Sequence, residues 1–368
     1  MNQKKQCEIC GREIFDDSYT VGGLHLCEKC YDSETFCCDC CGNRFLNTHD
    51  HGDDSTALCL HCYEEHYHRC ARCNMLVYAD DVYWGNDETF CRDCYEEYHN
   101  SYIKDYYYKP SPIFYKRHGE ETVRYYGIEL EIDRGVKDDD YAERIYDKAN
   151  QNDDVLYIKS DSSLDEGMEL VSHPCSMQYH KHEFPWKEIM KEAVQLGYRS
   201  HNTTTCGLHI HIGRAELGKT VEQQEEVISR IMFFFESHWN EIFQFSRRTE
   251  HSVNRWASRY GYKDKPKEIL EDAKKTTKGR YTCVNITNYS TVEIRIFKGT
   301  LKWNTLMAAI ELVDAICENA MNLTDDELHK QSWNDFVMGI NPDYNELVKY
   351  LKERRLYVNE PVECEEEI

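Results

Sequence analysis

Strict alternation of aliphatic and polar residues marks several short segments beyond the first third of the chain. In the first of them, YGIELEID, isoleucine and leucine alternate with Glu129, Glu131 and Asp133. A period of two places the aliphatic side chains on one face of a β-strand and the carboxylates on the other. The segment therefore predicts a strand that is buried on one side and acidic on the other.

Two further segments repeat this alternation. VLYIKSDSSLDEGMELVSHP predicts two short strands around an acidic turn, with Asp161 and Glu169 as the polar candidates. CGLHIHIG sets His209 and His211 against three aliphatic residues. Each pattern predicts a strand with one apolar face and one face of ionisable groups.

The last strands of this type lie near residue 290. RYTCVNITN begins at Arg280, and STVEIRIFKG sets Glu293 and Arg295 against aliphatic neighbours. Because ionisable groups occupy only one face of each strand, the pattern favours an antiparallel sheet with one covered side. A doubly wound parallel sheet would be buried on both faces.

Segments with helical periodicity separate these strands and could cover the apolar face of the sheet. They span about residues 138–150, 185–196, 220–245, 303–322 and 343–354. This order of elements predicts an α+β domain in which helices pack on one face of an antiparallel sheet.

The residue types on the polar face change the interpretation of the sheet. A face that only meets water would favour lysine, threonine and serine, whereas glutamate, histidine and arginine recur here. Several carboxylates on one face repel each other unless cations lie between them, and carboxylate oxygens suit magnesium or manganese. An arginine beside them suits a phosphoryl or carboxylate oxygen. Together these groups are what ATP-dependent activation of a carboxyl group requires.

The first 95 residues follow a different pattern, in which cysteine pairs repeat. Each of three units reads C-x-x-C, then 16 or 17 residues, then C-x-x-C followed by tyrosine, and the first cysteines of successive units are 31 and 32 residues apart. Four thiolates complete a tetrahedral shell that suits structural zinc, with iron as the alternative metal. The predicted ligands are Cys7, Cys10, Cys27 and Cys30; Cys38, Cys41, Cys59 and Cys62; and Cys70, Cys73, Cys91 and Cys94.

Two features of these modules stay open. Cys37 and Cys40 are left over and offset the second unit by one residue, so that its register is undecided. Residues 1–94 contain 8 Lys and Arg against 18 Asp and Glu, a net charge of −10, and each four-thiolate zinc site adds about two negative charges. A peptide or protein partner is therefore expected for the modules, and nucleic acid is not.

Composition supports an assignment to the cytoplasm. The net charge is −23, no apolar run approaches 18 residues, and the N-terminal MNQKKQCEIC lacks an apolar signal-peptide core. Paired thiols in a reducing compartment indicate metal binding rather than disulfides. We expect zinc modules in residues 1–95, a tyrosine-rich linker in 96–124 and a second domain in 125–368.

The order of five motifs resembles the amidoligase family, a branch of the carboxylate–amine ligases with a glutamine-synthetase-like catalytic fold. The motifs are GIELEID, KSDSSLDEGMELVSHP, CGLHIHIG, an arginine ahead of CVNITN, and TVEIRIFKGTL. The resemblance covers about residues 125–325 and implies an antiparallel sheet curved around ATP and divalent ions. The N-terminal modules resemble short treble-clef or LIM-like zinc ribbons.

The resemblance also implies roles for individual residues. Magnesium or manganese would be held by four carboxylates, those of Glu129, Glu131, Glu169 and Glu293. Metal or nucleotide phosphate would contact His209 and His211, with Arg247 and Arg255 as further phosphate candidates. Catalysis would involve Arg295, Arg280 and Asp161, which would stabilise charge or orient the substrate.

Three other hypotheses remain. Gly213–Thr220 matches the phosphate-binding loop G-x-x-x-x-G-K-[ST] between a strand and a helix, although that strand carries histidines and no magnesium-binding aspartate follows. The chain could instead be a non-catalytic adaptor built on zinc modules. A metal-dependent hydrolase that uses the two histidines would be active without ATP.

Overall fold

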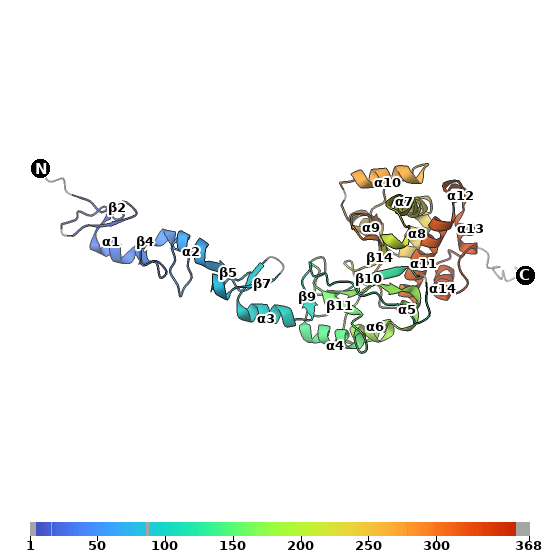
Figure 1. Ribbon diagram of the computed structural model, residues 1–368, viewed down its shortest axis with the longest axis horizontal. Helices are drawn as coiled ribbons and strands as arrows, with labels where there is room; N and C mark the ends of the chain where they lie inside the picture. Colours follow the sequence, from blue (N-terminus) through green and yellow to red (C-terminus); the bar gives the residue numbers. More distant parts are fainter. Residues whose placement is uncertain (1–4, 16, 86–87, 122, 278, 358–368) are drawn as a thin grey trace, which may run out of the picture. The chain divides into compact units, whose positions relative to one another are not determined.

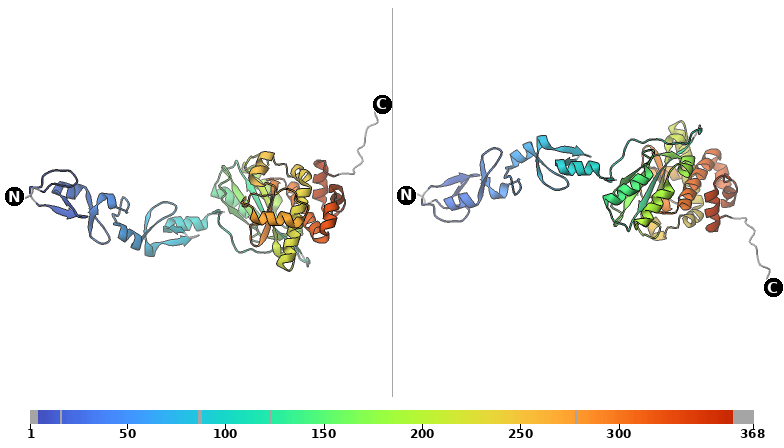
Figure 2. Two further views of the ribbon diagram at one scale, coloured as in Figure 1. Left: turned by 90° about the horizontal axis from the view of Figure 1, so that it is seen from above. Right: turned by 90° about the horizontal axis from the view of Figure 1, so that it is seen from below.

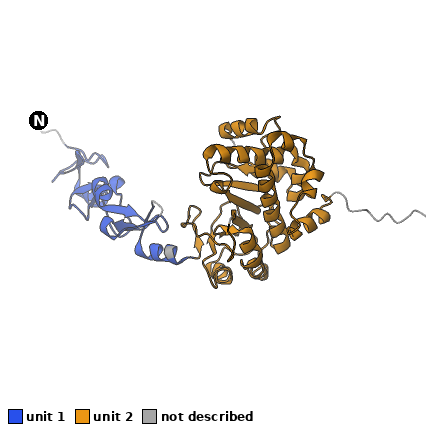
Figure 3. Ribbon diagram, turned by 45° about the vertical axis from the view of Figure 1, so that its right-hand side comes forward, with its two compact units in different colours: residues 1–101 blue, residues 102–368 orange. Residues whose placement is uncertain are grey.

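The computed structural model describes residues 5–15, 17–85, 88–121, 123–277 and 279–357. The chain divides into two compact units, residues 1–101 (unit 1) and residues 102–368 (unit 2) (Figures 1 and 3). Within the described ranges, no helix combines the length and the apolar character needed to cross a bilayer.

Unit 1 repeats a small structure of antiparallel hairpins and one helix. The strands are β1 (Tyr19–Val21), β2 (Leu24–Leu26), β3 (Thr35–Cys37), β4 (Arg44–Leu46), β5 (Tyr67–Arg69), β6 (Leu76–Tyr78), β7 (Tyr83–Gly85) and β8 (Glu88–Phe90). The helices are α1 (Glu28–Ser33), α2 (Leu60–His66) and α3 (Arg92–Asn100), and two 3₁₀ turns cover Asn47–His49 and Ala79–Asp81.

The same tight backbone turn positions the first two cysteines in each module. The carbonyl of the first cysteine accepts a hydrogen bond of 2.8 to 2.9 Å from the backbone N–H four residues later. That later residue is Gly11, Gly42 or Asn74, and its φ is 72°, 72° or 59°. Glycine adopts this left-handed conformation without strain, and asparagine tolerates it better than most residues. The third cysteine is the N-cap of the module's helix, and the fourth is the third helical residue.

Successive modules share apolar contacts. Leu46 of β4 packs on the core of the first module, and Tyr67 and Leu76 pack on the core of the second. The Arg44 guanidinium lies 4.3 Å from the ring centre of Tyr31, a cation–π contact between the first and second modules. Because each module alone has a small core, these contacts add to the stability that bound metal would supply.

Unit 2 is built on an eight-stranded sheet within the described residues. The strand order is β15-β16-β14-β10-β12-β11-β9, and β13 pairs with β10. All pairings are antiparallel except that of β11 with β9. The strands are β9 (Ile103–Lys104), β10 (Tyr125–Ile132), β11 (Leu156–Lys159), β12 (Met168–Ser172), β13 (Cys175–Ser176), β14 (Gly207–Gly213), β15 (Val284–Asn285) and β16 (Thr291–Lys298).

Figure 2 shows the helices of unit 2 packed beside this sheet. The expected ones are α4 (Asp139–Ala149), α6 (Trp186–Gln195), α7 (Val221–Ser237), α8 (Trp239–Ser246), α11 (Trp303–Asn322) and α14 (Asn345–Glu353). The segment expected as one helix over 220–245 is divided at His238, which leaves helical geometry with φ −109° and ψ 32°. Shorter helices not expected from the sequence are α5 (Met177–His182), α9 (Glu250–Trp256), α10 (Pro266–Lys275), α12 (Asp325–Lys330) and α13 (Trp333–Met338).

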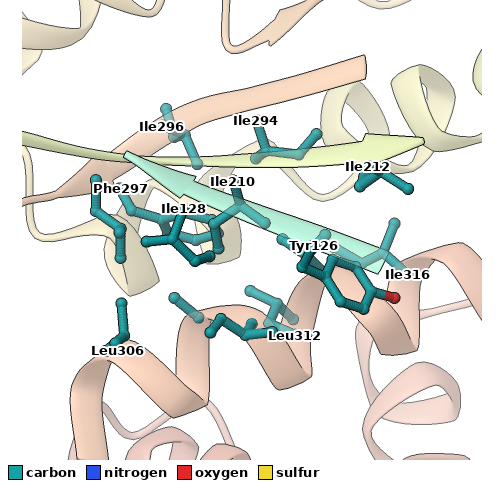
Figure 4. Close-up of a cluster of buried hydrophobic side chains, with 14 of the residues drawn as sticks. Tyr126, Ile128, Ile210, Ile212, Ile294, Ile296, Phe297, Leu306, Leu312 and Ile316 are labelled. Carbon is teal, nitrogen blue, oxygen red and sulfur yellow. The ribbon is translucent and has the colours of Figure 1, made fainter. Parts of the chain in front are cut away.

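The apolar face of the sheet and the helices share one core. Figure 4 shows aliphatic side chains of β10, β14 and β16, among them Ile128, Ile210 and Ile294, close to Leu306 and Leu312 of α11. All five are buried completely. The alternation in the sequence therefore predicts the covered face correctly, and the mixed α+β class with an antiparallel sheet is confirmed.

The tyrosine-rich stretch does not form a separate linker along its whole length. Strand β9 pairs in parallel with β11 at the edge of the sheet. Further along, the Tyr115 N–H donates to the Pro174 carbonyl at 3.0 Å. These backbone hydrogen bonds attach the stretch to unit 2, so the structure places the boundary between the units after residue 101 and not near residue 124.

Acid should destabilise unit 2 through His180, which is fully buried. Its Nε2 donates to the Tyr126 carbonyl at 2.8 Å, and its Nδ1 accepts from Trp186 Nε1 at 3.2 Å. Burial lowers the pKa of His180 to about 4, from about 6.5 in the unfolded chain. The folded state therefore binds fewer protons, and its full stability above pH 6.5 falls by up to about 3 kcal/mol as the pH drops towards 4.

The measurement is the free energy of unfolding between pH 7 and pH 4, compared with His180→Gln. Glutamine can donate and accept at similar positions but does not titrate. The difference between the two proteins should shrink as the pH falls. A difference that stays constant over this range would contradict the assignment.

Candidate active site and metal centres

Strand register brings the predicted polar residues together on one face of the sheet. Glu129 on β10 lies opposite His209 on β14, and His211 on β14 lies opposite Glu293 on β16. Arg295 follows Glu293 by two residues on β16. Directly opposed residues on one face have Cβ atoms about 4.5–5.5 Å apart, so these side chains are close neighbours.

The polar face lines a cavity of about 710 Å³. Small-molecule sites in proteins have volumes of roughly 300–1,000 Å³. Most of the residues predicted from the sequence contribute to its wall. They are Glu129, Asp161, Glu169, His209, His211, Arg280, Glu293 and Arg295.

Glu129 stands at the centre of this wall. Its Oε2 lies 3.2 Å from His209 Nδ1, and its Oε1 lies 3.2 Å from His211 Nε2. It belongs to two groups whose donor atoms all lie within 4.8 Å of one another, one with His211 and Glu293 and the other with Glu169 and His209. A carboxylate shared in this way can bridge two cations.

The electrostatics of these groups fit bound cations. Burial and the nearby Glu129 carboxylate raise the pKa of Glu169 well above its usual range. Burial opposes ionisation of Glu129 as well, but the imidazoles of His211 and His209 hold its pKa well below the usual range. Adjacent carboxyl groups are thus pushed towards different protonation states, and a divalent ion would favour ionisation of both.

Two buried nitrogen atoms at the cavity support the same interpretation. Within the described chain, His211 Nε2 and Arg295 Nε have no hydrogen-bond partner. The 3.2 Å contact from His211 Nε2 to Glu129 lacks hydrogen-bond alignment. Since buried polar atoms are normally paired, both atoms suit a ligand or ion in the cavity. Carboxylates outnumber imidazoles in the donor set, which favours magnesium or manganese.

Glu131, predicted as a metal ligand, does not line the cavity, although it lies on the polar face opposite Glu169 of β12. It is 5% exposed and accepts a short hydrogen bond from the Gly207 N–H. Its Oε1 is 3.9 Å from His209 Nε2. Oε2 of Glu131 is therefore engaged by the backbone, and its Oε1 is too far from His209 for a hydrogen bond.

Lys159 and Arg248 are cations at this face that the sequence reasoning did not single out. Lys159 Nζ lies 3.7 Å from Glu169 Oε2, and both side chains are buried. Arg248 donates to the Phe297 carbonyl at 3.1 Å, and burial lowers its pKa to about 10 although Glu131 opposes this. The alternation of β11 could have indicated Lys159, because it follows Tyr157 by two residues on the polar face.

The remaining predicted arginines differ in position. Arg280 lines the mouth of the cavity. Arg247 instead lines a separate hollow of about 270 Å³ beside Arg199 and His201. Arg255 is exposed and stacks on the Trp256 ring at 4.5 Å. The structure therefore does not bring Arg247 or Arg255 to the cavity.

Asp161 lies in the turn between β11 and β12 and lines the cavity. Its Oδ1 accepts a hydrogen bond of 2.6 Å from the Ser163 N–H. This bond fixes the turn, while the carboxylate stays accessible to a substrate group in the cavity.

The cysteines of unit 1 form the three clusters expected from their spacing. Within each cluster the four sulfur atoms lie within 4.8 Å of one another. The second and third cysteines of each cluster have sulfur atoms 3.8, 4.0 and 3.8 Å apart in the three modules. A regular tetrahedron with Zn–S bonds of about 2.3 Å has edges of about 3.8 Å, so the clusters could hold zinc.

The second cluster contains Cys38 and Cys41 and leaves out Cys37 and Cys40, and of the adjacent pair Cys38 is buried whereas Cys37 is exposed. Cys37 Sγ donates to the Gly42 carbonyl at 3.2 Å. Burial opposes ionisation of Cys38, but the backbone N–H groups of Cys41, Cys59 and Cys40 lower its pKa to about 6. The buried cysteine is therefore the one prepared to act as a thiolate ligand.

The segment Gly213–Thr220 does not have the geometry of a phosphate-binding loop. Gln223 Oε1 accepts hydrogen bonds from the N–H groups of Lys219 and Thr220, at 2.9 and 3.3 Å. The Thr220 hydroxyl accepts from the Gln223 N–H and caps α7. A phosphate loop requires backbone N–H groups and this hydroxyl to be free for the ligand, and here a capping box engages them.

Comparison with known proteins identifies one matching family. The family model described as "Putative amidoligase enzyme" matches residues 133–317. A search of curated proteins found no match. Among solved structures, a bifunctional glutathione synthetase from Pasteurella multocida matches with 12% identity and a TM-score of 0.32, over 63% of this chain and 46% of that one. The chain thus spans less than half of that structure, and likeness at this level carries no functional argument.

Proposed function

The chain belongs to the amidoligase family through residues 133–317, and from this premise we propose that unit 2 is an ATP-dependent ligase. It would require magnesium or manganese and join a carboxylate to an amine in an amide bond. The observation that carries the proposal is the pair of overlapping donor groups that share Glu129 beside Arg295 in one cavity.

The chemistry follows from charge. A carboxylate is a poor electrophile, and transfer of the γ-phosphoryl group of ATP converts it to an acyl phosphate. Attack by an amine then forms the C–N bond, the C–O bond to phosphate breaks, inorganic phosphate leaves, and the amine nitrogen gives up a proton to a carboxylate that acts as general base. Divalent ions held by Glu129, Glu169, Glu293 and the two histidines would neutralise phosphate oxygens in this reaction.

The protein's own residues would bind, orient and neutralise the substrates. The Arg295 guanidinium is held by Glu293, and its unpaired Nε is available to an oxygen that gains negative charge. Arg280 at the mouth would contact a second anionic group. Asp161, which lines the cavity, would orient the amine substrate.

The test follows phosphate release by the purified protein with ATP, magnesium, candidate carboxylates and an amine. We expect release to need all of them, and ATP with magnesium to raise the melting temperature, since a ligand that binds the folded state stabilises it. Hydrolysis without ATP would instead favour the metal-dependent hydrolase, and absence of ATP binding the non-catalytic adaptor.

Lys219→Ala discriminates the phosphate-loop alternative within the same assay. Lys219 is exposed and its N–H is bound by Gln223, so we expect its replacement to leave ATP binding within about twofold of the unchanged protein. Complete loss of nucleotide binding in this variant would overturn the ligase assignment in favour of the phosphate loop.

For unit 1 we propose three structural zinc ions and a docking role towards a peptide or protein. Four-thiolate sites leave no open position for catalysis. The acidic charge of the modules supports a protein partner over nucleic acid. A docked peptide would give the ligase a carboxylate or amine on a macromolecule.

A further inference from the structure

Residues 105–112, which we call the strap, contribute Tyr106, Tyr107, Lys109, Pro110 and Pro112 to the wall of the cavity. The strap lies outside the region matched by the amidoligase model. It is attached on one side by β9 and the hydrogen bond of 2.8 Å from the Ser160 N–H to the Lys104 carbonyl. On the other side, the Ile113 N–H donates to His173 Nδ1 at 3.3 Å. A segment fixed at both ends can hold a side chain at a defined place over the site.

Tyr106 is the strap residue that contacts functional groups of the cavity. Arg280 Nη1 donates a short hydrogen bond to the Tyr106 hydroxyl, and the guanidinium lies 5.4 Å from the ring centre. Lys159 Nζ lies 5.3 Å from the same ring centre. Lys159 in turn faces Glu169, one of the candidate ion ligands. A single tyrosine therefore contacts two cations of the proposed active site.

Contacts with two tyrosines give Arg280 a defined position. It is exposed, it follows Gly279, whose φ is 58°, and its guanidinium also lies 5.3 Å from the ring centre of Tyr281. A free arginine side chain samples many rotamers, and binding an anion would cost that freedom. One bond to Tyr106 uses a single N–H of the guanidinium, so other N–H groups of its five-donor fork remain for a substrate oxygen.

We infer that Tyr106 is a positioning residue, which holds Arg280 and Lys159 at the cavity mouth to receive the anionic substrate of the ligase. The inference rests on the proposed function of unit 2. The tyrosine-rich stretch precedes the region matched by the family model, and the inference gives this stretch a role in the active site.

The kinetic test compares Tyr106→Leu with Tyr262→Leu, a matched change at a tyrosine that is 46% exposed and does not line the cavity. Loss of the hydroxyl and the ring at residue 106 should lower kcat/KM for ATP-dependent phosphate release about tenfold, and Tyr262→Leu should change it less than twofold. Tyr106→Phe keeps the ring and should recover part of the loss.

A double-mutant cycle separates positioning from mere packing. In an Arg280→Gln background, Tyr106→Leu should cause little further loss, because the group that it positions is already absent. If Tyr106→Leu lowers kcat/KM equally in both backgrounds, the tyrosine does not act through Arg280 and the inference is overturned.

A second measurement does not depend on ligase activity. Chymotrypsin cleaves after tyrosine, and the strap contains Tyr106, Tyr107 and Tyr108. Arg280→Gln should accelerate cleavage within the strap several-fold, as mapped by mass spectrometry, whereas the exposed control Arg255→Gln should not. Equal rates in Arg280→Gln and the unchanged protein would overturn the inference. Accelerated cleavage without any ATP-dependent reaction would overturn the proposed function alone.

Discussion

Replacing Glu129 with glutamine is expected to lower ATP-dependent phosphate release by roughly 10²- to 10³-fold. Glu129 contributes to both donor groups, and it contacts both histidines at 3.2 Å. Glutamine keeps the volume but removes the negative charge and replaces one ligand oxygen with an NH₂ group. Both candidate ion positions are therefore weakened by one change.

The measurement is the initial rate of phosphate release as a function of magnesium concentration, together with the melting temperature. Glu188→Gln is the matched control, because Glu188 is exposed in the first turn of α6, outside the cavity. We expect the control to match the unchanged protein. A Glu129→Gln protein that melts normally and retains more than a tenth of the rate would exclude Glu129 as a shared ion ligand.

The polar face of the sheet could be predicted from the sequence because strands have a simple period. In YGIELEID and CGLHIHIG, alternation alone assigns Glu129 and His209 to a different face from Ile128 and Ile210, and the structure agrees. Which strands lie side by side cannot be read from alternation. The pairing of β14 between β10 and β16 brings together segments about 80 residues apart, and neither alternation nor the order of the family motifs predicts it.

Two adjacent arginines show that alternation does not predict which side chain outside a strand reaches the polar face. Arg247 and Arg248 follow a helix whose end is marked by the left-handed conformation of Arg247, with φ 60°. Arg248 follows that turn and belongs to no strand or helix with a regular repeat, so its spacing in the sequence does not tell whether its side chain faces the sheet. The prediction selected Arg247 and Arg255, whereas it is Arg248 that approaches Glu131 at the polar face.

The sequence predicts a linker at the strap because its composition is that of a linker. KPSP and a run of tyrosines give neither a helical nor a strand period. Its attachment uses a two-residue strand and isolated backbone hydrogen bonds. Elements this short have no sequence signature, so the role of Tyr106 emerges only from the three-dimensional arrangement.

Replacing Cys38 with serine is expected to remove one of three zinc ions and unfold the middle module. Cys38 is 1% exposed and belongs to the second cluster with Cys41, Cys59 and Cys62. Structural zinc in such small domains contributes roughly 10–16 kcal/mol of binding free energy, far more than a core of this size supplies. Leu46 and Tyr67 pack between modules, so the neighbouring modules should also lose stability.

Cys37→Ser is the matched control at the adjacent residue. Cys37 is exposed and its thiol contacts only the Gly42 carbonyl among the contacts described for it, so a serine hydroxyl can replace that bond. Zinc per chain, measured by elemental analysis, should stay at three for Cys37→Ser and fall to two or fewer for Cys38→Ser. The opposite result would shift the knuckle by one residue, to Cys37 and Cys40. Gly11 and Asn74 directly follow the second ligand of their modules and form the left-handed turn that closes the knuckle. With Cys40 as the second ligand, Gly42 would no longer directly follow it, and the turn of the second module would lie one residue later than in the other two.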